Sequence, residues 1–328
     1  MLKLGEQDIK GLFLGGYEIK KAYLGKEPVF ENGPGYITGV DWWEATLPET
    51  ANWMNIAYGG RKFVAITNNS NKAAYSLDGI TWTMTTLPRS TYWQDVCYGG
   101  DRFVAISSSN NYGAYSLDGI TWTAMTLPNQ SSANWYRIAY GGGIFFVIPN
   151  GNVTRGCYSS DGRTWTTVTM RSTGTGWSSL TYGADKFVAI SKSGQLIAYS
   201  TNGTSWKLVN TPSTGSWTDI SYGAGKFVSI NYNNNNKAIY SLDGLTWAEA
   251  VLPTSANWFK IAYGTERFVT VAYNSDKAAY SEDGINWTAV TLPSSGNWQC
   301  LAYGDGKFVA LPFGGNKFIY SSAKGPGT

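Results

Sequence analysis

The chain has 328 residues, of which 39 are glycine and only 14% are charged, so it is rich in turns and weakly charged. Aromatic residues make up 15% of the chain. Because each aromatic side chain buries about 150–250 Å², this composition predicts a folded protein rather than a disordered one. No apolar run reaches the roughly 18 residues that span a bilayer, and Met1–Glu6 lacks the apolar stretch of a signal peptide. We therefore expect neither membrane insertion nor classical secretion.

Charge and histidine content exclude several classes of function. The 25 basic and 22 acidic residues are scattered singly, with a formal net charge of +3 and no basic stripe, so we expect no nucleic-acid partner. The sequence contains no histidine, which excludes Ser-His-Asp and Cys-His catalysis, imidazole acid–base chemistry and zinc sites that need imidazole. We assign no catalytic residue, no metal site and no cofactor.

Residues 1–34 have a period of ten residues, marked by Leu-Gly pairs at Leu4, Leu14 and Leu24. The pattern predicts a small β-meander with glycine-containing turns. A segment of about 30 residues buries too little surface to fold alone. We therefore expect it to pack on the rest of the chain, on copies of itself as a homo-oligomer, or on a larger assembly.

The stretch Leu12–Gly25 within this segment resembles the amino-terminal segments of phage and prophage tail proteins from Gram-positive bacteria. The resemblance implies that residues 1–34 dock onto other tail or virion proteins, ahead of a domain that is displayed outward. It also implies a place in the virion after synthesis in the bacterial cytoplasm. A bacterial protein that carries the same type of domain is the open alternative.

The rest of the chain is built from a repeat of 40 to 42 residues. Tyr-Gly pairs mark its copies at Tyr58, Tyr98, Tyr140, Tyr182, Tyr222, Tyr263 and Tyr303. Each unit has four short apolar stretches separated by turn residues, as in Trp53–Gly59, Lys62–Ile66, Ala73–Gly79 and Thr81–Pro88, which indicates four β-strands. The seven units predict an all-β protein with a seven-bladed β-propeller over residues 35–322, followed by a tail at residues 323–328.

The seventh unit ends at Ser321 without an outer strand, and a matching segment is present before the first unit. Gly39–Pro48 aligns with Gly79–Pro88 without a gap. We therefore expect residues 36–48 to pair with the last unit and close the ring, because closure removes an exposed sheet edge.

A short motif, Ser76–Trp82 in the first unit, recurs through the chain. Its other copies are Ser116–Trp122, Ser159–Trp165, Ser200–Trp206, Ser241–Trp247 and Ser281–Trp287. The motif resembles the Asp-box of sialidase-like propellers, shortened so that Asp and Gly are adjacent, and with Asn202 in place of Asp in one copy. Its Ser and Asp side chains suit the backbone donors of a tight turn. The resemblance implies a propeller in which these motifs lie away from any active site.

A sialidase-like glycoside hydrolase is therefore one alternative to weigh. Sialidases of this fold use three arginines, a Tyr-Glu pair and an aspartic acid, and this sequence has no Arg-Ile-Pro element near its start. Glycoside hydrolysis in general needs two facing carboxylates. Asp95 and Asp219 interrupt the repeat pattern, but the sequence assigns neither of them a partner. We therefore expect a protein that is not an enzyme.

The units differ mainly in the loops between their second and third strands, which share one face of a propeller with the connections between blades. These loops are rich in Asn, Ser and Tyr, as in residues 107–112 and 231–236. Amides and hydroxyls match sugar hydroxyl groups, aromatic faces stack on apolar sugar surfaces, and arginine suits a carboxylate or phosphate. The candidate ligand-binding residues of this face are Tyr92, Tyr112, Tyr136, Arg137, Arg155, Arg171, Tyr232, Phe259, Lys260 and Tyr273. The alternative is a set of solvated loops without a ligand.

These features together favour a non-catalytic adhesin on a phage tail or virion, which presents a loop-rich propeller face to a bacterial or mucosal surface glycan. Two other functions stay open. One is a structural virion component without glycan affinity, and the other is the glycoside hydrolase.

Overall fold

The computed structural model describes residues 36–129, 134–151, 154–170 and 176–323, and within residues 1–35 it describes the backbone of six short strands. These six pair as three antiparallel hairpins: β1 (Lys3–Leu4) with β2 (Gln7–Asp8), β3 (Leu12–Leu14) with β4 (Tyr17–Ile19), and β5 (Lys21–Leu24) with β6 (Glu27–Glu31). The short strands agree with the predicted ten-residue period. Each of the described hairpins pairs locally, between consecutive strands.

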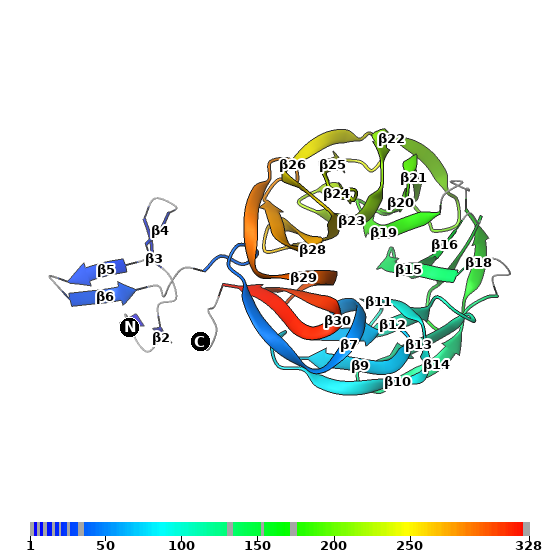
Figure 1. Cartoon of the computed structure of the whole chain (residues 1–328), viewed down its shortest axis with the longest axis horizontal. Coiled ribbons are helices and arrows are strands. Elements are labelled where there is room, and N and C mark those ends of the chain that lie inside the picture. Colours follow the sequence, from blue (N-terminus) through cyan, green and yellow to red (C-terminus); the bar gives the residue numbers. More distant parts are fainter. Residues whose placement is uncertain are drawn as a thin grey trace.

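The described strands of the repeat region form antiparallel ladders that follow one another along the chain (Figure 1). Four sheets have four strands each: β11 (Trp93–Gly99), β12 (Arg102–Ser107), β13 (Tyr112–Ser116) and β14 (Thr123–Thr126); β15 (Asn134–Gly141), β16 (Ile144–Asn150), β17 (Arg155–Ser159) and β18 (Thr166–Thr169); β19 (Trp177–Gly183), β20 (Lys186–Ser191), β21 (Gly194–Ser200) and β22 (Lys207–Gly215); β23 (Trp217–Gly223), β24 (Lys226–Asn231), β25 (Asn235–Ser241) and β26 (Ala248–Ala256). The all-β prediction is confirmed. Within the described ranges, no helix is long and apolar enough to cross a membrane.

The other eight strands of the repeat region form one sheet. They are β7 (Trp43–Gly59), β8 (Lys62–Thr67), β9 (Ser70–Ser76), β10 (Thr83–Thr91), β27 (Trp258–Gly264), β28 (Arg267–Ser281), β29 (Thr288–Gly304) and β30 (Lys307–Ser322). The first part of β7 pairs with β30, with Thr46 opposite Lys317, and its second part pairs with β8, with Tyr58 opposite Phe63. This strand begins at Trp43 rather than at residue 36, because Val40 and Asp41 turn back and donate their amides to the carbonyl of Ile37.

The sheets surround a central axis, and the first strand of each repeat lies nearest to it (Figure 1). Neighbouring first strands contact each other in chain order: β7 with β11, β11 with β15, β15 with β19, β19 with β23, β23 with β27, β27 with β29, and β29 with β7. The seven first strands, which in β7 and β29 are the second halves of the long strands, therefore lie around the same axis.

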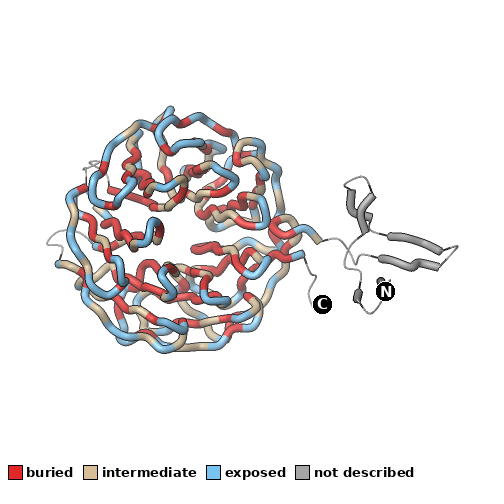
Figure 2. Tube along the Cα trace, turned by 180° about the vertical axis from the view of Figure 1, so that it is seen from behind, coloured by how far each residue is buried: buried red, intermediate tan, exposed pale blue. Residues whose placement is uncertain are grey.

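The core lies between neighbouring sheets. The second strand of a repeat is apolar on both faces, as in Phe63–Ile66, where every side chain is fully buried. A strand that has a sheet on either side loses the alternation of polar and apolar residues, which explains this run. The tryptophan that begins each first strand is also buried, at 2% exposure or less: Trp53, Trp93, Trp135, Trp177, Trp217, Trp258 and Trp298. Figure 2 shows buried segments between the sheets and exposed residues along the outer rim.

The tyrosine of each Tyr-Gly pair lies directly on the glycine of the preceding repeat. A methyl group at Gly141 would lie 1.9 Å from Cγ of Tyr182, and one at Gly304 would lie 2.0 Å from Cγ of Tyr58. Glycine is required there because only a residue without Cβ lets the ring approach so closely. The contact of Tyr58 with Gly304 joins the first repeat to the last.

The recurring Ser-x-Asp-Gly turns are held by their own side chains, as the sequence predicts. Oδ1 of Asp78 accepts hydrogen bonds from the amides of Ile80 and Thr81 at 2.8 and 2.7 Å, and from Oγ of Ser76 at 2.9 Å. Oγ of Ser76 accepts the amide of Gly79 at 2.8 Å. In the variant copy, Oδ1 of Asn202 accepts the two equivalent amides, both at 2.9 Å. The turn therefore needs a side-chain oxygen, whether or not it is charged.

Because of the carboxylates in these turns, the stability of the fold should depend on pH in the acidic range. Burial alone raises the pKa of Asp118, but the hydrogen bonds from Ile120, Thr121 and Ser116 outweigh it and lower the pKa from 3.8 to about 2; opposing effects of the same kind lower the pKa of Asp161 to about 2. A lowered pKa in the folded state stabilises the fold above the ordinary pKa, and this stabilisation is lost as the pH falls from about 4 to 2. As the pH falls over that range, we expect the melting temperature of the double variant Asp118→Asn, Asp161→Asn to fall less than that of the wild type.

Thermal unfolding followed by circular dichroism at pH 2 to 5 measures this difference. Asp276→Asn, outside these turns in β28, is the control and should keep the wild-type pH dependence. Equal pH slopes for the wild type and the double variant would contradict the prediction.

A second prediction concerns the Tyr-Gly contact. Gly141→Ala should lower the free energy of unfolding by about 1–3 kcal/mol, because the added methyl group overlaps the ring of Tyr182. Gly315→Ala is the matched control, since its nearest neighbour, Cγ of Pro312, would lie at an ordinary 3.5 Å. Chemical denaturation measures both variants, and similar losses for the two would argue against a special role for the ring contact.

Candidate functional site

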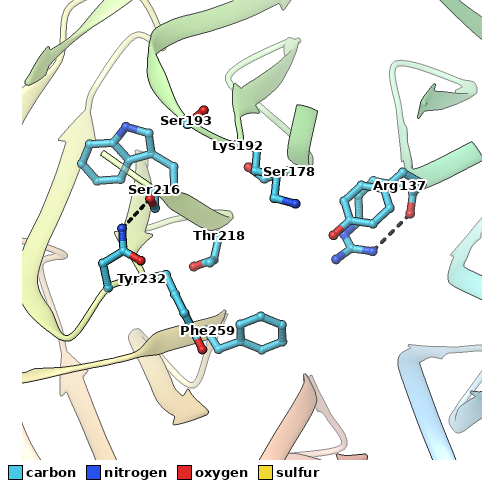
Figure 3. Close-up of a pocket in the computed structure, with 11 residues that line it drawn as sticks. Arg137, Ser178, Lys192, Ser193, Ser216, Thr218, Tyr232 and Phe259 are labelled. Carbon is cyan, nitrogen blue, oxygen red and sulfur yellow. Dashed lines mark hydrogen bonds between the residues drawn. The ribbon is translucent and has the colours of Figure 1, made fainter. Parts of the chain in front are cut away.

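A cavity of about 400 Å³ lies where the first strands of four consecutive repeats begin (Figure 3). It is lined by Tyr136, Arg137, Ser178, Lys192, Ser193, Ser216, Trp217, Thr218, Tyr232, Asn233 and Phe259. These residues come from the starts of β15, β19, β23 and β27, from the loops that follow β20 and β24, and, for Ser216, from the connection between β22 and β23. This is the face that the sequence marks as variable between repeats.

A β-bulge near the start of each first strand turns side chains toward the cavity. The ladder with the second strand shifts register between Trp135 and Arg137, and again between Trp217 and Asp219. A bulge leaves one residue unpaired and re-aims its side chain. The residue after the tryptophan lines the cavity in four repeats, where it is Tyr136, Ser178, Thr218 and Phe259. The scaffold repeats, whereas the chemistry at this position does not.

Aromatic rings form two sides of the cavity. On one side the ring of Phe259 lies between those of Tyr232 and Tyr273, with centroid distances of 6.2 and 5.2 Å. On the other side the guanidinium of Arg137 lies over the ring of Tyr136, with Cζ 4.0 Å from the centroid. Ser178 and Thr218 line the cavity between them (Figure 3). Their hydroxyl groups donate to the carbonyls of Ile190 and Trp258 at 3.1 and 3.0 Å, and their oxygen atoms can still accept hydrogen bonds. The cavity thus offers flat apolar faces alternating with hydrogen-bonding groups.

Arg137 is the buried cation of the cavity, with 6% of its surface exposed. Burial alone lowers its pKa, but Tyr136, Asp95 and Asp219 outweigh this effect and raise it, so the side chain carries its charge. Nη1 donates to the carbonyl of Tyr136 at 3.1 Å. The Nε–H group has no hydrogen-bond partner among the described residues. The guanidinium therefore has a buried N–H group that no described group accepts.

A layer of polar side chains lies at the next position of the first strands. Oδ1 of Asp95 accepts bonds from the side chain of Asn55 and the amide of Val96, and its Oδ2 accepts the amide of Ile138 at 2.9 Å. Burial raises the pKa of Asp95, and the charge of Arg137 opposes this rise. Asp95 therefore links the second and third repeats through the backbone amide of Ile138.

Asp219 makes the equivalent link on the far side of the axis. Its Oδ1 accepts the hydroxyl of Ser179 at 2.6 Å and its Oδ2 accepts the amide of Ile261 at 3.2 Å. Nζ of Lys260 lies 4.0 Å from Oδ2, which balances the carboxylate charge. The structure thus gives both acids hydrogen-bond partners, which the sequence alone could not assign. Each carboxylate accepts an amide of another first strand and so joins two first strands.

Four of the ten candidate ligand-binding residues line the cavity: Tyr136, Arg137, Tyr232 and Phe259. Two more lie behind it. Tyr273 packs on Phe259, and Lys260 is buried with Nζ 5.6 Å from the centroid of the Phe259 ring. Residues far apart in the sequence thus form one group.

The other candidates do not line this cavity. Tyr92 is half exposed and Arg155 is exposed at the start of β17. Tyr112 lies under the guanidinium of Arg89, with Cζ 3.9 Å from the ring centroid. Arg171 lies outside the described residues. Of the candidate arginines that the structure describes, Arg137 lines the cavity and Arg155 does not.

Sequence reasoning missed several lining residues. Ser178 and Thr218 could have been found from their place directly after the tryptophan, where Tyr136 and Phe259 were noticed because they are aromatic. Lys192, Ser193, Ser216, Trp217 and Asn233 also line the cavity. Polar loop residues of these types carry no signal that separates them from ordinary solvated loops.

The role of Asp95 can be tested by removing one of its acceptor atoms. Asp95→Asn should destabilise the fold by about 1–3 kcal/mol, because an amide cannot accept the bonds of Asn55, Val96 and Ile138 at both of its ends. Asp101→Asn is the control, at an exposed turn with φ of 60° that Asn adopts easily. Urea denaturation measures both, and equal stability would show that the bonds contribute little.

No family model matches the chain, and no curated protein matches it in sequence. Solved structures do match. Virginiamycin B lyase from Staphylococcus aureus is 14% identical with a TM-score of 0.75, over 86% of this chain and 99% of that one. YCF48 bound to a D1 peptide is 17% identical with a TM-score of 0.69, over 89% and 99%. The WD40 domain of Pan2 from Neurospora crassa is 9% identical with a TM-score of 0.68, over 89% and 98%. All three are β-propellers, and this chain shares their fold.

Proposed function

We propose that the chain is a non-catalytic binding protein whose cavity-bearing face binds a surface glycan. The observation that carries the proposal is the cavity itself, where aromatic rings, hydroxyl groups and one buried arginine meet. Its volume of about 400 Å³ falls in the range of small-ligand sites, roughly 300–1,000 Å³. A sugar offers apolar C–H faces and a set of hydroxyl groups, which match this combination.

We also infer that the propeller has seven blades and that β7 and β30 close the ring. Two contacts support this: β29 lies against β7, and the ring of Tyr58 lies on Gly304. A closed ring would hold the four cavity-forming repeats at fixed distances. The site would then be preorganised, which lowers the entropic cost of binding.

A binding role fits the chemistry of this chain better than a lyase activity like that of the structural neighbour, or a glycoside hydrolase activity. A histidine-to-alanine variant of the S. aureus virginiamycin B lyase is described as catalytically inactive, and the present sequence has no histidine. Glycoside hydrolysis needs two available carboxylates. Asp95 and Asp219 instead accept backbone amides and support the first strands, and neither lines the cavity.

The site of action follows from residues 1–34. Their resemblance to tail-protein segments supports a virion-associated adhesin, made in the bacterial cytoplasm and docked through this segment onto other tail proteins or onto its own copies. The propeller would then face the host surface. A structural virion component without glycan affinity and a sialidase-like glycoside hydrolase are the alternatives that the test must separate.

The test applies the full-length chain to an array of bacterial and mucosal glycans and checks each hit for bond cleavage by mass spectrometry. We expect saturable binding without cleavage. Phe259→Ala and Tyr136→Ala should each weaken binding about five- to ten-fold, because each removes an aromatic contact of about 1 kcal/mol.

Tyr92→Ala is the matched control, since this half-exposed ring does not line the cavity and its loss should leave affinity unchanged. Release of a free sugar would establish a glycoside hydrolase instead. No binding on the array by a folded protein would favour the structural alternative.

A further inference from the structure

Resting on the proposed function of this face, we infer that the ligand is an anionic saccharide chain. Its charged group binds at Arg137, and its next residues extend past Ser216 and Asn233 into a second, adjoining cavity. The inference adds to the proposed function a ligand charge, an anchoring residue and a direction of binding. It draws on the charges, the unpartnered donors and the connected shape of the two cavities.

The second cavity has a volume of about 380 Å³ and shares two residues with the first. It is lined by Gly194, Thr214, Gly215, Ser216, Asn231, Asn233, Asn235 and Lys237. The shared residues, Ser216 and Asn233, are joined by a hydrogen bond of 2.7 Å from Nδ2 of Asn233 to Oγ of Ser216. The two cavities therefore adjoin at this pair of polar side chains, and a linear ligand can occupy both.

The charges of the two cavities have one sign. Arg137 and Lys192 line the first cavity and Lys237 lines the second, whereas neither lining contains an aspartate or glutamate. Lys192 and Lys237 are exposed. Asp95 and Asp219 in the first strands both act on the charge of Arg137, and Asp219 also lies 4.0 Å from Nζ of Lys260. A neutral saccharide would leave the three lining cations unused, whereas an anionic one would pair with them.

Arg137 is the anchor because its position is fixed and its donors are not all used. It is buried and held over Tyr136, yet its Nε–H lacks a partner among the described residues. A buried donor without a partner costs free energy that a ligand acceptor recovers. A carboxylate or a phosphate accepts two N–H groups of one guanidinium, which a hydroxyl group does not.

Two unpartnered donors lie where the cavities adjoin, one on a residue of the second cavity, Asn231, and one on a residue of the first, Trp217. Nδ2 of Asn231 and Nε1 of Trp217 are buried and have no hydrogen-bond partner among the described residues. Both side chains flank Gly215, since a methyl group there would lie 2.2 Å from Nδ2 of Asn231 and 2.7 Å from Cε2 of Trp217. Glycine thus lets these two side chains pack directly against the backbone at the edge of the second cavity. Ring, hydroxyl or acid oxygens of a second sugar residue are the acceptors that suit them.

The experiment compares matched glycans that differ only in charge. The probes are carboxylate-bearing oligosaccharides, their neutral methyl esters, and phosphate-bearing oligosaccharides with their unphosphorylated counterparts, all titrated against the full-length chain. We expect binding to acidic members at least ten-fold tighter than to their neutral partners, with affinity falling as salt is raised. The carboxylate and phosphate series distinguish the two sources of negative charge.

Variants then locate the contact. Arg137→Gln should weaken acidic binding about ten-fold or more, because a charge-assisted bond is lost. Since Arg137 is buried beside Asp95, Lys192→Gln and Lys237→Gln serve as exposed variants that keep the fold, and each should weaken binding and reduce its salt dependence. Lys207→Gln, at an exposed position in β22, is the control for a general loss of positive charge.

The outcomes separate this inference from the proposed function. Equal binding of acidic and neutral partners, unaffected by the three variants, would overturn the anionic ligand while leaving glycan binding intact. Equal affinity of single sugars and longer chains, with Lys237→Gln silent, would overturn the extension into the second cavity. No binding of any glycan would overturn the proposed function, and this inference with it.

Discussion

The stacking of a tyrosine ring on a glycine of the preceding repeat is the contact on which the arrangement of the sheets depends. It sets how closely neighbouring first strands approach, because a single methyl group would not fit between Gly141 and Tyr182. Sheets held this close exclude water from both faces of the strands behind them. The apolar run of Phe63–Ile66 and the buried tryptophans follow from that spacing.

The β-bulge after each tryptophan separates scaffold from site. The tryptophan before it is buried in every repeat, and the residue two positions later joins neighbouring strands in two repeats, as Asp95 and Asp219 do. The residue between them is left unpaired in the ladder by the register shift. It lines the cavity as Tyr136, Ser178, Thr218 or Phe259 without disturbing the packing. A repeated fold can therefore carry a site in which no two neighbouring positions are alike.

The parts of the molecule that repeat could be predicted from the sequence, and the parts that do not could be predicted only in fragments. Tyr136 and Phe259 were found because an aromatic residue breaks a regular pattern, but Tyr92 and Tyr112 break it too and lie elsewhere. What separates them is their place around the axis, which depends on how the sheets are arranged. The partners of Asp95 were hidden for another reason. One of them is the amide of Ile138, 43 residues away, and a backbone donor is the same at every position.

The pairing of β7 with β30 has a consequence for the order in which the molecule is made. Trp43 lies opposite Tyr320, so the first long strand of the repeat region has no partner for its leading half until the segment around Tyr320 has left the ribosome. A waiting strand edge is open to pairing with another chain. The strands that build the cavity meet no such delay, since β15, β19, β23 and β27 each pair with the next strand along the chain. Local order in the cavity can thus precede the pairing of β7 with β30.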